Sequence, residues 1–144
     1  MWLSALILLA IALAATVAGL LLRARSRLRP ASRGASADAL TPGELGIPAL
    51  GERATLVQFS SAFCQPCRAT RVVLGEVTGV VPGVVHVEVD AESNLDLVRR
   101  LGVMRTPTVL VLDAHGSIVR RASGAPRKAD VLATLAAVVA PAAR

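Results

Sequence analysis

Cysteine and aromatic residues are both scarce in this chain of 144 residues. It contains two cysteines, two phenylalanines, one tryptophan and no tyrosine. The two histidines, His86 and His115, and the two cysteines are too few and too scattered for a structural zinc site with four ligands. Arg68 follows the second cysteine, which excludes the Cys-x-x-Cys-His haem motif. We therefore expect no metal and no cofactor. A copper site of two thiols and a histidine is an alternative that the histidine positions do not favour.

Charge is absent from residues 2–22. As a helix this largely apolar run would span about 31 Å, which matches a bilayer core of about 30 Å. No basic residue precedes it, and arginines rather than a small-residue cleavage site follow it. These features favour a membrane anchor over a cleaved signal peptide. The sequence therefore predicts a single N-terminal transmembrane helix at residues 1–22.

Positive charge is concentrated directly after this run. Five arginines account for five of the six net positive charges: Arg23, Arg25, Arg27, Arg29 and Arg33. The rest of the chain is nearly neutral, so the high pI gives no reason to expect a nucleic-acid partner. Basic residues that flank a membrane helix stay on the cytoplasmic side, so we expect a cytoplasmic domain and keep the extracytoplasmic side as the alternative. We assign residues 23–40 to a basic juxtamembrane segment and linker, and residues 41–144 to the folded domain.

Strand and helix patterns alternate along the domain. Thr-Pro-Gly-Glu at residues 41–44 has the form of a capping box. We expect strands at residues 54–60, 84–89, 108–112 and 117–122, and helices at residues 67–78, 93–101 and 127–139. The inner face of the first helix is expected to carry Ala69, Val73 and Val77. This order predicts an α/β fold with a mixed central sheet, helices on both faces and an antiparallel hairpin at one edge.

The two cysteines lie between the first strand and the first helix. Cys64 would sit at the helix N-terminus, where unpaired N–H groups and the helix dipole favour a thiolate. That lowers its pKa and makes it the nucleophile. Cys67 lies one turn further along, close enough to close a disulfide, and Pro66 restricts the loop between them. The arrangement predicts a redox dithiol.

Several motifs resemble the thioredoxin family. Phe-Cys-Gln-Pro-Cys at residues 63–67 is similar to the family's Trp-Cys-Gly-Pro-Cys, and Arg-Thr-Pro-Thr at residues 105–108 is similar to its cis-proline loop. The resemblance implies a thioredoxin-like fold and a thiol–disulfide oxidoreductase, in which Cys64 attacks a substrate disulfide and Cys67 resolves the mixed disulfide. It also implies a substrate surface, with Thr106 presenting its backbone as for an added strand. That surface comprises Phe63, Pro66, Thr106 and Pro107.

Two buried positions depart from the family pattern. Gln58 stands where thioredoxins usually carry a buried Asp that helps the second cysteine exchange its proton, and Gln cannot titrate. His86 stands where the family often has Lys. Because the reference pKa of histidine is about 6.5, we hypothesise that His86 assists proton transfer to Cys67. The alternative is that His86 is a partly buried residue hydrogen-bonded to Gln58.

The resemblance and the anchor together predict a monomeric, membrane-anchored protein-disulfide reductase. Its partners would be protein disulfides and an electron-donating reductase or membrane thiol protein. An extracytoplasmic relative acting in cytochrome c maturation, or on the thiols of exported proteins, is one alternative. Another is a redox-inactive binding module with the same fold. A purely structural disulfide is a further alternative, although such bridges are rare in the cytoplasm.

Overall fold

The computed structural model describes residues 13–18, 29–30 and 39–139. Residues 13–18 are helical. Most of the predicted anchor at residues 1–22 lies outside these ranges. Within them, no helix has the length and apolar character needed to cross a membrane.

The order of strands and helices predicted from residue 54 onward is confirmed. The elements are, in chain order, β1 (Arg29–Pro30), the 3-10 helix η2 (Gly43–Leu45), β2 (Ala54–Ser60), α2 (Gln65–Val80), β3 (Val84–Asp90), α3 (Leu95–Arg100), β4 (Thr108–Asp113), β5 (Ile118–Ser123) and α4 (Lys128–Val139). The two-residue strand β1 was not predicted, and it lies in the segment assigned to the linker. The bounds of β2 agree with the prediction at both ends.

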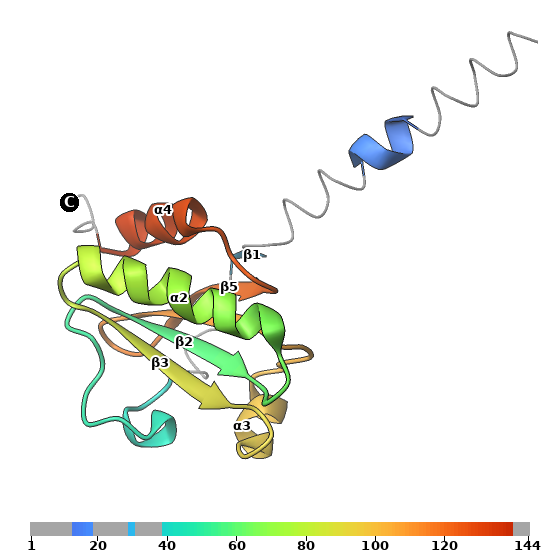
Figure 1. Ribbon diagram of the computed structural model, residues 1–144. Helices are drawn as coiled ribbons and strands as arrows, with labels where there is room; N and C mark the ends of the chain where they lie inside the picture. Colours follow the sequence, from blue (N-terminus) through green and yellow to red (C-terminus); the bar gives the residue numbers. More distant parts are fainter. Residues whose placement is uncertain (1–12, 19–28, 31–38, 140–144) are drawn as a thin grey trace, which may run out of the picture.

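The strands form one mixed sheet in the order β1-β5-β4-β2-β3. β2 runs parallel to β3 and antiparallel to β4, and β4 and β5 form the predicted antiparallel hairpin. β1 pairs with the outer side of β5. β2 therefore lies inside the sheet, and all seven of its residues are buried. The loop that follows β2 and leads to α2 therefore starts near the middle of the domain (Figure 1).

Strand side chains alternate between the two faces of the sheet, so each face has its own core. α2 and α4 cover one face (Figure 1), where Leu74 and Leu135 pack against the apolar cluster that includes Leu56 of β2. The opposite face packs Phe59 of β2 against residues of η2 and the end of α3, among them Leu101. The helices thus fix the sheet from both sides, as the sequence predicts.

The inner face of α2 differs from the predicted one. Val77 is buried as expected, but Ala69 is exposed and Val73 is only half-buried. The residues that face the sheet are Cys67, Thr70, Leu74 and Val77. A spacing of four residues drifts around a helix with 3.6 residues per turn, whereas the observed spacing of three, four and three follows one face. The stripe therefore begins at Cys67, which places that cysteine against the sheet.

The start of α3 also differs from the prediction. Ser93 was expected to open this helix, but the helix begins at Leu95. The Ser93 hydroxyl instead donates to the carboxylate of Asp90, and the Glu92 N–H donates to the same carboxylate at 3.0 Å. Ser93 is therefore part of the turn that follows β3 rather than a helix cap.

The capping box at residues 41–44 is present. The Thr41 N–H donates to Glu44 Oε2 at 2.8 Å, and the Glu44 N–H donates to Thr41 Oγ1 at 3.4 Å. The Glu44 carboxylate also pairs with Arg100 of α3. These contacts, led by the Thr41 N–H, lower the pKa of Glu44 to about 2. The exposed ion pair joins η2 to α3 on the face opposite α2.

Candidate active site

Cys64 and Cys67 form a disulfide at the beginning of α2, with their Cα atoms 5.2 Å apart. β2 ends at Ser60, and four residues later Cys64 is the N-cap of the helix. Because β2 and β3 are parallel and β4 is antiparallel to β2, the C-terminal ends of β2 and β3 and the start of β4 lie at the same end of the sheet. The start of α2, where the two cysteines lie, is at this end of the sheet (Figure 1).

The two cysteines have different environments. Cys64 is half-buried, and its sulfur accepts the Cys67 N–H at 3.2 Å. Cys67 is only 2% exposed. A thiolate at Cys64 would be stabilised by this N–H group and by the helix dipole, whereas Cys67 is shielded from solution. The reachable sulfur is therefore the one at the helix N-terminus, as the sequence predicts.

The predicted cis-proline loop lies beside the dithiol. The Thr106–Pro107 peptide bond is cis, Pro107 is buried and Thr106 is half-buried. The hydroxyls of Ser61 and Thr106 share a hydrogen bond of 3.1 Å. This bond joins the loop before Cys64 to the loop before Pro107. Ser61 was not among the predicted site residues, because its partner is distant in sequence and no local motif marks the contact.

The other predicted substrate-contacting residues lie in the open. Phe63 is 99% exposed, and Pro66 in the first turn of α2 is also exposed. Met104, in the loop before β4, is 91% exposed and was not predicted. Large apolar side chains at such exposure are available to a partner.

Gln58 connects the central strand to the dithiol helix. It is fully buried, and its Nε2 donates to the carbonyl oxygen of Cys67 and to Ser60 Oγ, both at 2.9 Å. Its Oε1 lies 3.2 Å from His86 Nε2. A carbonyl only accepts, so the Gln58 amide must turn its NH₂ group toward Cys67. Its oxygen then faces His86, which must carry a proton on Nε2.

His86 is linked to Cys67 through Gln58. Burial lowers the pKa of His86, Arg71 lowers it further, and Glu88 opposes them. Arg71 of α2 forms a bidentate ion pair with Glu88 of β3, at 2.6 and 2.7 Å. This pair lowers the pKa of Glu88 and raises that of Arg71. With its pKa lowered, the His86 ring favours the neutral form that donates from Nε2 to Gln58.

The structure thus contains the hydrogen bond between His86 and Gln58 that the alternative interpretation of His86 predicts. His115 lies apart, in the turn between β4 and β5, where its N–H donates to Asp113. No group of three or more His, Cys, Asp or Glu residues is arranged to hold a metal ion in the part of the chain that the structure describes.

The family model for thioredoxin matches residues 49–137. The chain belongs to the thioredoxin family. A human protein, thioredoxin domain-containing protein 2, is 35% identical over 65 residues, which are 45% of this chain and 12% of that protein. The match therefore spans a small part of this relative's length.

Solved thioredoxin structures share the fold. A mutant thioredoxin from Halobacterium salinarum NRC-1 has a TM-score of 0.58 and 18% identity, over 64% of this chain and 80% of the other. Fasciola hepatica thioredoxin has a TM-score of 0.53 and 23% identity, over 61% and 83%. At these identities the likeness concerns the fold alone. Together with the disulfide-bonded Cys64–Cys67 pair, family membership supports thiol–disulfide redox chemistry.

The lowered pKa of His86 predicts how stability depends on pH. The unfolded chain binds a proton at His86 at a higher pH than the folded chain does, so the free energy of unfolding falls as the pH drops through about 6.5. The carboxylates with lowered pKa values contribute only in more acidic solution. Replacing His86 with Gln keeps a donor to Gln58 and removes the titration. We expect His86→Gln to flatten the dependence between pH 7.5 and 5.5.

Urea unfolding at several pH values measures this effect. One such group contributes a slope of at most about 1.4 kcal/mol per pH unit. His115→Gln is the matched control, because His115 is exposed in a turn, and it should keep the wild-type slope. An equal slope in His86→Gln and in the wild type would contradict the assignment.

Proposed function

We propose that this chain is a protein-disulfide reductase of the thioredoxin type, anchored in a membrane. The observation that carries the proposal is the difference between the two sulfurs. Cys64 is half-buried and accepts an N–H hydrogen bond, whereas Cys67, to which it is bonded, is only 2% exposed. A nucleophile must reach its substrate, and a resolving thiol needs to reach only the nucleophile.

In the reduced protein, the Cys64 thiolate attacks one sulfur of a substrate disulfide. The substrate S–S bond breaks, its leaving sulfur takes a proton, and Cys64 is joined to the substrate by a mixed disulfide. Cys67 then loses its proton and attacks the Cys64 sulfur, which releases the second substrate thiol. Two electrons pass to the substrate, and the Cys64–Cys67 disulfide forms. A separate reductase or a membrane thiol protein would regenerate the dithiol.

The loop before Pro107 would hold the substrate during this exchange. Thr106 is half-buried and tied to Ser61, so its backbone has a fixed position near Cys64. We propose that it pairs with an extended substrate segment, as an added strand does. The exposed Phe63 and Pro66 would border the same segment.

Formation of a trapped complex tests the reaction. With Cys67→Ser, the mixed disulfide has no resolving thiol, so we expect a covalent adduct between Cys64 and a protein disulfide substrate, visible on a non-reducing gel. Cys64→Ser should give no adduct. The wild type should reduce insulin disulfides in the presence of a chemical reductant, and both variants should fall to the rate of the reductant alone. If wild type and Cys64→Ser were equally inert, the chain would be a redox-inactive binding module.

The Cys67 proton needs a route during resolution. His86 is a titratable side chain linked to the Cys67 backbone: its Nε2 donates to Gln58, which donates to the Cys67 carbonyl. Its lowered pKa favours the neutral ring, in which Nδ1 is the nitrogen able to accept a proton. We propose that His86, held in position by its hydrogen bond to Gln58, assists the departure of this proton. His86→Ala should slow the release of the second substrate thiol and shift its pH profile. Stopped-flow kinetics measure both, and an unchanged rate and profile would refute the role.

The proposal places the domain on the cytoplasmic side of the membrane. Its support is the uncharged run at residues 2–22 and the arginines that follow it. In intact cells, a membrane-impermeant thiol reagent should then fail to label Cys64 after mild reduction, and permeabilised cells should show labelling. Labelling without permeabilisation would place the domain outside the cytoplasm and favour a role with exported or cytochrome thiols.

A further inference from the structure

The charged side chains of the domain divide into paired and unpaired groups. Five of its basic residues form ion pairs with acidic side chains: Arg71, Arg99, Arg100, Arg127 and Lys128. Arg121 instead donates to the carbonyls of Leu101 and Gly102. Over residues 39–139, four further arginines have no acidic partner: Arg53, Arg68, Arg105 and Arg120. An unpaired cation is free to meet an acid on another molecule.

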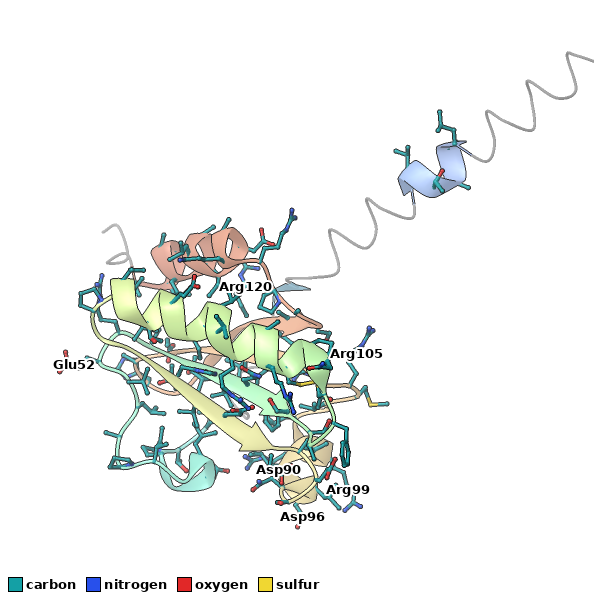
Figure 2. The ribbon with its side chains drawn as sticks, viewed as in Figure 1. Glu52, Asp90, Asp96, Arg99, Arg105 and Arg120 are labelled. Carbon is teal, nitrogen blue, oxygen red and sulfur yellow. A yellow bond between two sulfur atoms is a disulfide. The ribbon has the colours of Figure 1, made fainter. Side chains whose placement is uncertain are left out.

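Two of these four arginines flank the dithiol. Arg68 follows Cys67 in the first turn of α2, three residues before Arg71, which pairs with Glu88 of β3. Residues three apart share a side of a helix, so Arg68 lies on the β3 side. Arg105 precedes Thr106 in the loop that enters β4 (Figure 2). Both arginines are exposed and lie next to site residues in the chain: Arg68 follows Cys67, and Arg105 precedes Thr106, whose hydroxyl is bonded to Ser61.

Two exposed apolar side chains lie in the same two segments of the chain. Phe63 and Met104 are the most exposed large apolar side chains that the structure describes, at 99% and 91%. Phe63 immediately precedes Cys64, and Met104 immediately precedes Arg105. The hydrogen bond between Ser61 and Thr106 holds their two loops together. An exposed aromatic ring and an exposed flexible thioether both suit contact with an apolar partner side chain.

Two acidic residues lie at the end of β3: Asp90, and the exposed Glu92, whose carboxylate has no basic partner among the described ion pairs. Asp90 is the last residue of that strand, and its carboxylate is occupied by the Ser93 hydroxyl and the Glu92 N–H. These contacts lower the pKa of Asp90. The Asp90 carboxylate is therefore occupied by hydrogen bonds within its own turn. The two unpaired arginines remain the cations that a docked segment would meet.

We propose that the dithiol acts on acidic protein segments, in which carboxylates flank a target disulfide that lies next to an apolar residue. The inference rests on the proposed reductase function and names its substrate class. The carboxylates would engage Arg68 and Arg105, whose planar guanidinium groups suit paired hydrogen bonds. The apolar residue would cover Phe63 and Met104. Charge of opposite sign speeds encounter and excludes basic competitors.

Three disulfide peptides that differ only in their flanking residues test this preference. The flanks would be glutamates, glutamines or lysines. With the full chain in a zwitterionic detergent, we expect kcat/KM to fall from the acidic to the neutral to the basic peptide. Each arginine should contribute roughly two- to fivefold, and the preference should shrink at high salt. Arg68→Glu and Arg105→Glu should each weaken or reverse the order.

Arg53→Glu and Arg120→Glu are the matched controls. They reverse the other two unpaired arginines, and Arg53 lies just before β2, at the far end of that strand from the dithiol. Both controls should keep the wild-type order. If they changed it as much as Arg68→Glu does, the effect would come from net charge and the proposed surface would be refuted.

A binding measurement separates this inference from the reductase proposal. Peptides with serine in place of both cysteines cannot exchange, so their affinity by fluorescence polarisation reports docking alone. Preferential binding of the acidic peptide, lost in Arg68→Glu and Arg105→Glu, would support the surface even if no peptide were reduced. Reduction of all three peptides at equal rates, with equal affinities, would overturn the inference and leave the reductase function standing.

Discussion

A buried amide holds the dithiol helix against the centre of the sheet. Gln58 has no exposure to solvent, and its Nε2 reaches both the carbonyl of Cys67 and the hydroxyl of Ser60. A buried polar group left without its partner would cost about 1–3 kcal/mol, so strand and helix are fixed relative to each other. The position of Cys67 against the sheet is fixed in part by this contact, and the same amide accepts the hydrogen bond of His86.

In this arrangement the buried side chains next to Cys67 are uncharged, and the charged side chains lie further out, at the surface. Gln58 cannot ionise, and burial lowers the pKa of His86 and disfavours its cation. Stabilisation of a Cys64 thiolate therefore falls to the Cys67 N–H and the helix dipole. The formal charges stand further out, in the Arg71–Glu88 pair and in the unpaired arginines. Substitutions of the buried residues and substitutions of the surface charges should consequently have separable effects.

Local sequence patterns predicted the strands and helices. The contacts between segments that are distant in the chain are visible only in the structure. The bounds of β2 were predictable because a short, mostly apolar segment lies between the charged Arg53 and the loop that carries the cysteines. The inner face of α2 was assigned wrongly because two of its members, Cys67 and Thr70, carry no strong apolar signal. The bond between Ser61 and Thr106 joins loops 45 residues apart. The exposure of Met104 depends on that same loop packing, which no spacing rule describes.

The difference between buried and exposed residues of the site also bears on what this chain shares with its family. The solved thioredoxins share their fold with this chain, whereas its redox chemistry is supported by the family model and by the Cys64–Cys67 disulfide. Buried groups such as Gln58 act on Cys67 but cannot touch a substrate. Discrimination between substrates must therefore come from exposed groups around Cys64. In this chain Phe63 and Met104 are exposed, and Arg68 and Arg105 have no acidic partner among the described residues. The proposed substrate preference therefore depends on surface residues that the fold does not dictate.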